Sequence, residues 1–576
     1  MKTLFLHVDY IKFKPLKKAL KNVEPLSEKE KKGSTIKDAL AILTAVEKSD
    51  VDVDKIVKKL VENIKEIAES VKVKNIVLYP YAHLSSDLAS PNKAIEILKK
   101  AEEMLKKEKG FSIFKAPFGY YKEFEVKVKG HPLAELSREI KVEEKGKEGT
   151  SEKDFDYKNA LRSIGKSVLD RKKLKPYDHR IIGQEMDLFS FNEVSPGSVF
   201  WHSNGLIIYN ELINFWREVH KKMEYQEIST PQILDNRLWK ISGHWNLYKE
   251  HMFLTEYENR DFAVKPMNCP GAMLVYKNKT RSYKELPLRF SEMGVVHRKE
   301  LSGVLAGLVR VVKMTQDDAH IFCTEKQLEN EIVQVVSLFR EILDKFGFKY
   351  RFTISVRSKK KEAKYLGNDK IWKKAEDSLI KGLKKLKLKF DIEPGEAKFY
   401  GPSLDIQIKD SLGREWQCST LQLDFNLPER FNLEYTGDDN KNHTPLLLHR
   451  VVYGSLERFI GILIEHCKGR FPLWLSPIQV RVLSFTERNV THAKKVIKQL
   501  AEKIPNLRID VDFRNVTMQG KVKDAELMRI PYIIVIGDKE ESSNSLAVRI
   551  KGSKKIESLK IGNFTEDLKK EIAERK

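Results

Sequence analysis

The chain has 576 residues, of which 41% are hydrophobic and 32% charged, which is enough for ordinary hydrophobic cores and, at about 150 residues per domain, for three or four domains. Its 105 Lys and Arg residues exceed its 82 Asp and Glu residues and give a formal net charge of +23, which favours a polyanionic partner, although heat-adapted proteins also carry many charged residues. The four cysteines are scattered and no stretch reaches about 18 apolar residues, so we expect no disulfide framework, signal peptide or membrane span, and a reducing, cytoplasmic location.

Residues 1–140 are predicted to form a small α/β unit. The sequence predicts buried strands at residues 3–13 and 75–84 and helices at residues 38–47, 53–71 and 92–108.

Residues 141–185 are rich in Lys, Glu, Asp and Gly and contain few apolar residues. This composition predicts a linker, with a partial helix around Asn159 to Leu169.

The third predicted unit, residues 186–472, contains a strand, an Arg-rich turn and a return strand between Pro287 and His320. Alternating apolar residues predict one strand around Leu288 to Val296 and its antiparallel partner from Leu308 to Met314. Arg298 and Glu300 precede the turn, where a guanidinium suits a phosphate and a carboxylate suits an amine or a base edge. A solvated ion pair explains these two residues equally well when they are considered alone.

A second candidate for anion binding is LHRVVYGSLERFIGILIE, from Leu448 to Glu465, which is predicted to be an amphipathic helix. Its glycines permit close backbone approach, and Arg458 lies about one turn from them. By itself this segment is better explained by an arginine on a helix surface.

Residues 473–576 alternate predicted strands with predicted helices, which indicates a separate α/β domain. The strands are expected at residues 478–485, 507–513, 532–538 and 546–550, and the helices at residues 491–503, 521–529 and 565–574.

Three segments together resemble the signature motifs of class II aminoacyl-tRNA synthetases: GSVFWHSNGLIIYNELINFWREVHKKMEYQEISTPQI, the hairpin with HRKE, and the helix with GSLERFIGILIE. The intervening SGHWNLYKEHMF, KPMNCPG, TQDDAHIFC, KFYGPSLDI and EWQCSTLQLDFNLPERFNLEY resemble the threonyl-tRNA synthetase family of archaeal type. The resemblance implies a multidomain α/β and α+β protein. Its expected parts are a deacylase-like α/β editing domain (1–140), a linker (141–185), a class II catalytic core with an antiparallel sheet (186–472) and an α/β anticodon-binding domain (473–576).

The same resemblance implies a threonine–tRNA ligase that activates threonine with ATP, transfers it to tRNA(Thr) and hydrolyses seryl-tRNA(Thr), working as a homodimer without a membrane. A buried group that engages the threonine hydroxyl can reject valine by roughly 10⁴ to 10⁵, whereas the methyl group that serine lacks is worth only about 1–3 kcal/mol. Binding can therefore exclude valine, but serine requires proofreading.

By resemblance, Cys269, His320 and His449 would bind one Zn²⁺ per subunit, whose open position would take the amino and hydroxyl groups of threonine. His320 with Cys323 is a competing ligand pair. Singly, the cysteine and both histidines are more typical of buried packing residues. The other expected substrate contacts are Asp318, Gln316, Tyr400 and Met267.

For adenylation, the resemblance implies that Arg298 and Arg458 stabilise the charge that develops at the α-phosphate and that Mg²⁺ binds the phosphates. The remaining expected ATP contacts are Glu300, Arg310, Gln417 and Thr420. His244 is expected to assist proton movement during transfer to tRNA, because an unshifted histidine titrates near neutrality.

The N-terminal unit is similar to archaeal editing domains through LFLHVDYIKF, YPYAHLSSDLA, KAPFGYYKEF and GHPLAELSR. The residues that match its functional positions are His83, Tyr121, Lys122 and Glu135. The C-terminal unit resembles class IIa anticodon-binding domains, in which Asn515, Arg529, Glu540 and Arg549 would read bases. Singly, each of these charged residues is more typical of a solvated surface.

Three positions depart from the family pattern: Ala272 replaces a histidine, Ser403 a lysine, and Val312 a basic residue. Two alternatives therefore remain, a deacylase with a decayed synthetic core and a non-enzymatic RNA-binding relative. A class IIa enzyme for proline or serine would leave the Cys/His/His set unexplained.

Overall fold

The computed structural model describes residues 1–20, 25–85, 87–108, 110–140, 157–158, 161, 164, 169–358, 365, 368–398, 400–550, 553 and 555–576. By contacts between residues, the chain divides into one unit from Met1 to Tyr157 and another from Lys158 to Lys576. Among the described residues, no helix is long and apolar enough to cross a membrane. The predicted helix from Asn159 to Leu169 lies outside the described residues except at positions 161, 164 and 169.

The first unit is a six-stranded sheet with two amphipathic helices, α2 and α3, packed on a shared apolar cluster. Asp52 and Ser90 cap these helices by accepting backbone N–H groups, and Pro91 occupies the first turn of α3, where no backbone donor is needed. The sheet order is β4-β3-β2-β1-β5, with β6 also paired to β1. The elements are β1 (Lys2–Lys18), α1 (Glu28–Lys31), β2 (Ser34–Ala45), α2 (Val53–Ser70), β3 (Asn75–Pro80), α3 (Pro91–Lys107), β4 (Ser112–Lys115), β5 (Tyr120–Val128) and β6 (Glu135–Glu139).

The helix predicted at residues 38–47 is wrong, because this segment forms most of strand β2. Residues from Ala39 to Ala45 are buried on both faces of the strand, so the apolar run does not alternate. A short continuous apolar run fits a buried strand and a buried helix equally well.

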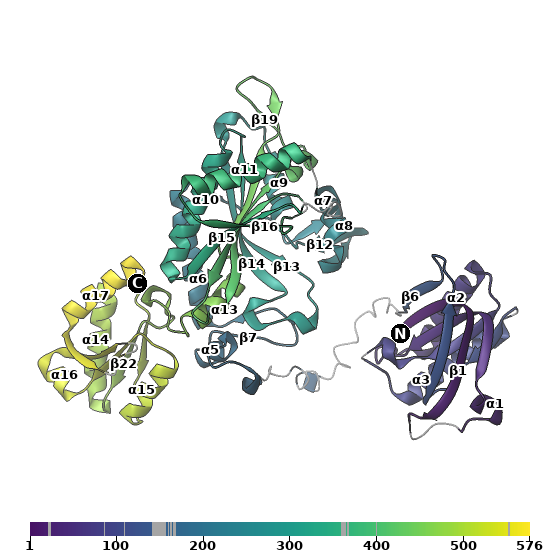
Figure 1. Cartoon of the computed structure of the whole chain (residues 1–576). Helices are drawn as coiled ribbons and strands as arrows, with labels where there is room; N and C mark the ends of the chain where they lie inside the picture. The colour runs from purple at the N-terminus through teal and green to yellow at the C-terminus, as the bar shows by residue number, and fades with distance from the viewer. Residues whose placement is uncertain are drawn as a thin grey trace. The chain divides into compact units, whose positions relative to one another are not determined.

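The second unit is organised around an eight-stranded sheet in the order β16-β15-β17-β18-β21-β14-β13-β9 (Figure 1). All of its neighbouring pairs are antiparallel except β15–β16 and β13–β9. Helices α6, α10, α11 and α13 contribute buried apolar side chains to one large core cluster with this sheet. A small sheet in the order β10-β12-β11 lies beside α7.

The strands of this region are β7 (Phe189–Ser190), β8 (Phe200–Trp201), β9 (Gln226–Glu227), β10 (Ile233–Asp235), β11 (Phe253–Tyr257), β12 (Arg260–Val264), β13 (Leu288–His297), β14 (Lys313–Cys323), β15 (Lys349–Val356), β16 (Phe390–Pro394), β17 (Ser403–Lys409), β18 (Glu415–Asp424), β19 (Tyr435–Thr436), β20 (Asn442–His443) and β21 (Leu446–Val451). The helices are α5 (His179–Glu185), α6 (Ser203–Lys222), α7 (Asn236–Ser242), α8 (His244–Tyr248), α9 (Cys269–Lys277), α10 (Leu328–Leu343), α11 (Asp369–Lys385), α12 (Asn426–Arg430) and α13 (Leu456–His466), with a 3-10 turn η7 (Gly307–Val309).

The strand predicted from Leu288 is confirmed, but its return strand begins at Lys313 rather than Leu308. Leu308 instead lies in η7, is fully buried, and donates its backbone N–H to the side chain of His179. The side chain of His179, which is distant in the sequence, therefore accepts the backbone N–H of Leu308. Sequence periodicity predicts that this N–H bonds within the sheet.

The single helix predicted from Leu448 to Glu465 is also wrong. Its first residues belong to β21, and the helix α13 begins only at Leu456, capped by Ser455. Gly454 has φ of +81°, and a Cβ there would lie 2.8 Å from the backbone oxygen of Cys418, so glycine is required at this turn.

The C-terminal elements confirm the predicted alternation of strands and helices. Their sheet has the order β23-β22-β24-β25-β26, with parallel pairing of β22 to β23 and β24 and antiparallel pairing beyond. The elements are β22 (Val480–Ser484), α14 (Val490–Lys503), β23 (Ile509–Asp512), α15 (Met518–Leu527), β24 (Tyr532–Ile536), α16 (Asp538–Ser543), β25 (Ser545–Ile550), β26 (Ile556–Lys560) and α17 (Ile561–Glu574).

Candidate functional site

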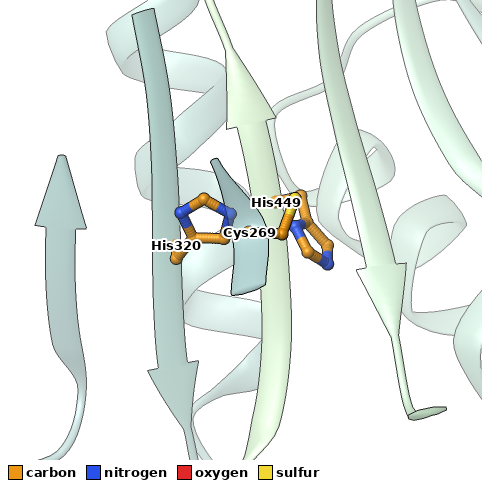
Figure 2. A group of neighbouring side chains, drawn as sticks. All are labelled: Cys269, His320 and His449. Carbon is orange, nitrogen blue, oxygen red and sulfur yellow. The ribbon is translucent and has the colours of Figure 1, made fainter. Parts of the chain in front are cut away.

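Cys269, His320 and His449 come from three separate elements and converge in space (Figure 2). Cys269 begins α9, and His320 on β14 is the direct antiparallel partner of His449 on β21. The two imidazole centroids are 5.0 Å apart with the rings crossing at 82°, and one ligand atom from each of the three side chains lies within 4.8 Å of the others. The structure therefore brings the three predicted metal ligands together.

The donor atoms of this group fit a divalent metal. Nε2 of His449 lies 2.9 Å from Oδ2 of Asp424, an orientation in which Nδ1 remains available as a ligand. Nε2 of His320 is buried and has no hydrogen-bond partner among the described residues. Burial disfavours the charged form of His449, but Cys269 and Asp424 more than offset this effect and raise the pKa of His449 to about 10, so a metal that binds Nδ1 would displace its proton. One thiol and two imidazoles are a donor set that suits Zn²⁺ with an open position.

The competing pair of His320 and Cys323 is not supported. Cys323 is fully buried in the large apolar core, where burial raises the pKa of its thiol far above the ordinary value. Residues three apart on a strand point to opposite faces, so the two side chains diverge.

A cavity of about 640 Å³ opens beside the metal-ligand group. Its lining contains nine of the residues predicted for the synthetic site: Met267, Cys269, Arg298, Gln316, Asp318, Tyr400, Thr420, His449 and His244. Sequence reasoning missed Gln422, Asp424, Lys398 and Arg430, which also line it. Glu300, Arg310, Gln417 and Arg458 lie outside this lining.

Asp318 is held in place by Asn268, whose Nδ2 donates to Oδ2 of Asp318 over 2.5 Å. Asn268 occupies the space above Gly294, where a Cβ would lie 2.2 Å from its Oδ1. Burial raises the pKa of Asp318, the hydrogen bond from Asn268 opposes this shift, and the nearby carboxylate of Glu292 adds to it. Asp318 is thus a fixed, partly buried acceptor at the cavity wall.

Tyr400 and Arg298 line other parts of the same cavity. The hydroxyl of Tyr400 donates to Oε1 of Gln422 over 2.6 Å, and burial raises its pKa well above the ordinary value, so it remains a neutral donor and acceptor. Nε of Arg298 donates to the backbone oxygen of Pro266 over 3.3 Å, and its guanidinium lies over the ring of Tyr248.

The predicted nucleotide contacts form three local groups. Arg310 donates to Oε2 of Glu300 over 2.9 Å. Gln417 and Thr420 both donate to Oδ1 of the buried Asp405, over 2.6 and 2.7 Å. The guanidinium of Arg458 lies 5.7 Å from the ring centroid of Trp416, and its Nε is buried without a hydrogen-bond partner among the described residues.

The buried carboxylate of Asp317 fixes the turn that leads to Arg458. It accepts backbone N–H groups from Val452, Tyr453 and Gly454 over 2.8 to 3.0 Å. Complete burial raises the pKa of Asp317 to about 6. Asp317 and Asp318 are neighbours on β14 and point to opposite faces, so one positions the turn and the other faces the cavity.

His244 is where the structure corrects the sequence analysis most clearly. The expectation that it titrates near neutrality is wrong, because burial and, after it, the nearby His449 lower its pKa to about 4. Its Nδ1 lies 2.8 Å from Oγ of Ser242. His244 is therefore a neutral hydrogen-bonding group at physiological pH.

The three departures from the family pattern occupy structural positions. Ala272 is fully buried in an apolar cluster with Tyr276 and Phe290. Ser403 is buried and donates to Oδ2 of Asp405 over 2.9 Å. The backbone N–H of Val312 donates to the backbone oxygen of Gly197, and its own backbone oxygen accepts the N–H of Arg298.

A second cavity, of about 480 Å³, lies in the N-terminal unit and is lined by His83, Tyr121 and Lys122. Nζ of Lys122 donates to the backbone oxygens of Pro117 and Tyr120, over 3.0 and 3.1 Å, and burial lowers its pKa to about 8. The fourth predicted residue, Glu135, is exposed on β6 opposite Leu6 and does not line this cavity.

The four predicted anticodon residues are scattered over the C-terminal region. Asn515 is exposed in the loop after β23, Glu540 accepts the backbone N–H of Gly537, and Arg549 pairs with Glu526. Arg529 donates to Glu185, to the backbone oxygen of Lys468 and to that of Leu527. The guanidinium of Arg529 is therefore occupied by contacts within the chain.

Comparison with known proteins gives three family matches along the chain. Residues 1–140 match the archaea-specific editing domain of threonyl-tRNA synthetase, residues 253–467 the tRNA synthetase class II core domain (G, H, P, S and T), and residues 479–571 the anticodon binding domain.

Two curated relatives named threonine–tRNA ligase illustrate the sequence similarity. The protein from Caldanaerobacter subterraneus subsp. tengcongensis is 48% identical over 413 residues, which are 71% of this chain and 63% of that protein. The protein from Clostridium tetani is 45% identical over 432 residues, which are 73% of this chain and 67% of that protein. The chain spans 62–63% of the length of the first three relatives that it matches.

Two solved structures named as threonyl-tRNA synthetases are also similar to this chain. The RNA binding domain of threonyl-tRNA synthetase from Cryptosporidium parvum Iowa II is 38% identical with a TM-score of 0.65, covering 68% of this chain and 98% of that one. The putative threonyl-tRNA synthetase ThrRS-1 from Aeropyrum pernix is 28% identical with a TM-score of 0.61, covering 69% of this chain and 97% of that one.

The lowered pKa of His244 predicts a flat titration. Because burial lowers its pKa to about 4, the imidazole stays neutral as pH falls from 8 to about 5.5. In ¹H–¹³C spectra of histidine-labelled protein, the His244 signal, assigned by its loss in His244→Gln, should not shift over this range. An inflection between pH 6 and 7 would contradict the burial argument.

Proposed function

The chain belongs to the threonine–tRNA ligase family, and we propose that it activates threonine with ATP, transfers it to tRNA(Thr), and hydrolyses seryl-tRNA(Thr) in its N-terminal unit. We also propose that it works as a homodimer in the cytoplasm, with a linker at residues 141–185 between the editing and catalytic domains and the anticodon-binding domain from residue 473.

One observation carries the synthetic part of this proposal. The metal-ligand group formed by Cys269, His320 and His449 lies at the cavity that also exposes Asp318, Tyr400 and Arg298. A metal can bind the amino and hydroxyl groups of threonine, and a fixed carboxylate can accept hydrogen bonds from them. A guanidinium can bind the phosphate with which the threonine carboxylate reacts.

Selection of threonine follows from these groups. Zn²⁺ held by Cys269, His320 and His449 would supply a Lewis acid that takes an amine and a hydroxyl together and is left unsatisfied by a methyl group. Asp318, fixed by Asn268, accepts from the substrate ammonium or hydroxyl. Gln316 and Tyr400 complete the polar wall, so valine would leave buried polar groups unpaired.

The adenylation step needs positioning and charge more than a nucleophilic side chain. The threonine carboxylate attacks the α-phosphorus of ATP and forms the adenylate, while the bond from this phosphorus to the bridging oxygen breaks and pyrophosphate leaves. Arg298 and Arg458 stabilise the charge that develops there, and Mg²⁺ would neutralise the phosphates. Nε of Arg458 is buried and has no hydrogen-bond partner in the part of the chain that the structure describes, which supports its role as a donor to a bound phosphate. Five further ATP contacts follow the family pattern: Glu300 and the Met267 backbone at the adenine, Arg310 at the triphosphate, and Gln417 and Thr420 at the ribose.

In the transfer step the terminal ribose hydroxyl of tRNA attacks the carbonyl carbon of the adenylate, the ester with the ribose forms, and AMP leaves. His244 lines the cavity and is neutral at physiological pH, so its free ring nitrogen can accept a proton. Because its pKa is low, His244 is a weak base. We therefore assign it a role in hydrogen bonding and in passing a proton on.

Editing is assigned to the apolar cavity with His83, Tyr121 and Lys122. Two backbone carbonyls fix Nζ of Lys122, which leaves a third N–H for the ester of a bound seryl-tRNA. Glu135 is the weakest member of the predicted set, because it does not line the cavity.

For anticodon recognition, exposed Asn515 is the best supported residue, followed by Glu540 and Arg549, whereas the contacts of Arg529 favour a structural role.

The two alternatives, a deacylase with a decayed core and an RNA-binding relative, are less well supported. A decayed core would not need to keep the ligand group together, nor the buried carboxylates that fix the turn before Arg458.

Threonine-dependent exchange of pyrophosphate into ATP tests the synthetic function. We expect exchange with wild-type protein and a loss of about 10²-fold to 10³-fold in kcat/KM in Arg298→Ala, because one developing charge loses its donor. Arg217→Ala, which removes a surface ion pair with Glu227, is the control and should retain activity. Wild-type protein without exchange would favour the alternatives, and release of serine from seryl-tRNA would then separate them.

Editing depends, in this proposal, on the charged form of Lys122. Lys122→Met should lower the enzymatic hydrolysis of seryl-tRNA(Thr) about 100-fold, whereas Lys127→Met, on the same strand but paired with Asp9, should not. Because burial lowers the pKa of Lys122 to about 8, its ammonium form is lost as pH rises through 8, and the wild-type rate, corrected for spontaneous hydrolysis, should fall above that pH. A rate that is the same in Lys122→Met would refute this assignment.

A further inference from the structure

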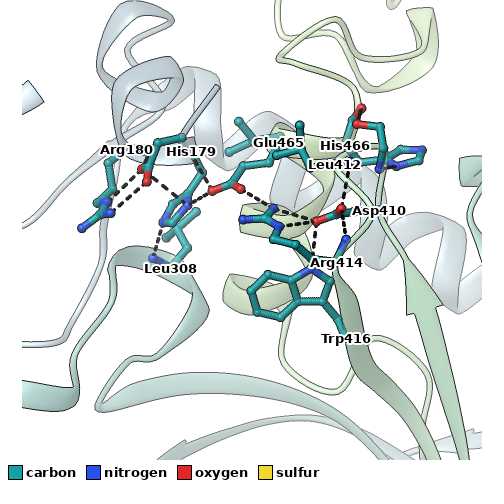
Figure 3. Close-up of polar contacts among 12 residues, drawn as sticks. His179, Arg180, Leu308, Asp410, Leu412, Arg414, Trp416, Glu465 and His466 are labelled. Atoms are coloured by element: carbon teal, nitrogen blue, oxygen red, sulfur yellow. Dashed lines mark hydrogen bonds and ion pairs between the residues drawn. The ribbon is translucent and has the colours of Figure 1, made fainter. Parts of the chain in front are cut away.

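A polar chain of six residues, buried at Leu308, His179 and Glu465 and partly exposed at Arg414 and Trp416, runs from the turn η7 to the aromatic ring beside Arg458 (Figure 3). We call it the His179 relay; its members are Leu308, His179, Glu465, Arg414, Asp410 and Trp416. We propose that the His179 relay positions the two arginines of the nucleotide site. His179 is the positioning residue for Arg310, through its bond to Leu308, whereas Glu465, Arg414 and Asp410 hold the ring of Trp416 beside Arg458. This inference rests on the proposed ATP-dependent function.

His179 joins two elements that sequence analysis treated separately. Its Nε2 accepts the backbone N–H of Leu308 over 3.0 Å, and its Nδ1 lies 2.6 Å from Oε1 of Glu465. A backbone N–H can only donate, so Nε2 is the acceptor and Nδ1 carries the hydrogen that is donated to Glu465. Leu308 is two residues before Arg310, and Glu465 lies on α13, the helix that carries Arg458.

Beyond Glu465 the relay returns to Arg458. The second carboxylate oxygen of Glu465 accepts from Arg414, whose Nε donates to Oδ2 of Asp410 over 2.7 Å. The same oxygen of Asp410 accepts the indole N–H of Trp416 over 2.9 Å. The ring of Trp416 then has Arg414 at 5.1 Å and Arg458 at 5.7 Å from its centroid.

Close packing fits the turn tightly to His179. A Cβ on Gly307 would lie 2.2 Å from Nε2 of His179, and φ of +53° at this residue also favours glycine. A Cβ on Gly461 would lie 3.0 Å from the Cβ of Leu308. The turn, the imidazole and α13 therefore leave little room for independent movement.

The same residues do not form a second metal site. Asp178, His179 and Glu465 have ligand atoms within 4.8 Å of one another. However, Asp178 accepts from Arg180 through both oxygens, Glu465 from Arg414, and both nitrogens of His179 are engaged. A cation would have to displace two guanidinium groups and a backbone N–H, so the cluster acts as a connector.

Two substitutions of His179 separate positioning from stability. Asparagine places its amide nitrogen near Nδ1 and keeps the bond to Glu465, whereas glutamine places its amide oxygen near Nε2 and keeps the bond from Leu308. Each variant loses one buried hydrogen bond, so both should lower Tm by similar amounts. For ATP with Mg²⁺, calorimetric titration should give a Kd about tenfold weaker in His179→Asn, because the turn before Arg310 loses its bond. In His179→Gln that bond remains and Glu465 still accepts from Arg414, so the Kd should stay within about twofold of wild type.

A second pair of variants leaves His179 intact. These variants test the relay even if the His179 variants fail to fold. Gly307→Ala should weaken ATP binding as His179→Asn does, whereas Gly303→Ala, where a Cβ meets no atom within 4 Å, should not. The KM for threonine in pyrophosphate exchange should stay unchanged in all four variants.

Equal ATP affinity in wild type, His179→Asn and Gly307→Ala would overturn the relay alone. Equal weakening in His179→Asn and His179→Gln would reduce His179 to a structural residue and would also overturn it. Wild-type protein that does not bind ATP would overturn both the relay and the proposed function.

Discussion

The register of two neighbouring strands decides whether this protein has a metal-ligand group at all. His320 on β14 faces His449 on β21 as a direct antiparallel pair, and Cys269 reaches both from the start of α9. Side chains alternate between the faces of a strand, so a slip of one residue would turn either histidine into the apolar core. The core itself fixes this register, since Ile321 and Leu448, the next pair along, are fully buried on the opposite face.

Buried carboxylates position the side chains and the turn that form the candidate site on this sheet. Asp317 holds the turn that precedes α13 through three backbone N–H groups, Asp405 gathers Gln417 and Thr420, and Asp424 orients His449. A buried charge costs free energy unless it is hydrogen-bonded, so each of these carboxylates restricts its partners to one arrangement. Catalysis of adenylate formation depends on positioning, which is the property that these contacts supply.

Much of the fold could be predicted from periodicity, and each error has a physical reason that the local pattern does not contain. The helices α2, α3 and α14 are predicted correctly because each exposes one polar face. The segment at residues 38–47 is predicted as a helix because the buried apolar run of β2 does not alternate. The end of β21 from Leu448 is the mixed run LHRV, which has no local signal that separates it from the helix that follows. The start of β14 was placed too early because the partner of the Leu308 N–H, His179, is distant in the sequence.

The site was predictable only in part, and for a different reason. Resemblance named Cys269, His320 and His449, yet no spacing rule could have joined residues so far apart. The carboxylates Asp317, Asp405 and Asp424 were missed because each looks like an ordinary strand residue until its buried partners are known. The pKa of His244 was misjudged because burial is a property of the fold and not of the motif.

The central claim is that the group of Cys269, His320 and His449 holds a zinc ion that distinguishes threonine from valine. The most direct measurement combines the metal content of purified protein with the ratio of kcat/KM for threonine and valine in pyrophosphate exchange, in wild type, Cys269→Ser and the control Cys467→Ser. The account predicts about one zinc per chain and a ratio of roughly 10⁴ or more in wild type and Cys467→Ser, with both lost in Cys269→Ser. A metal-free Cys269→Ser protein that still excludes valine as strongly as wild type would contradict it.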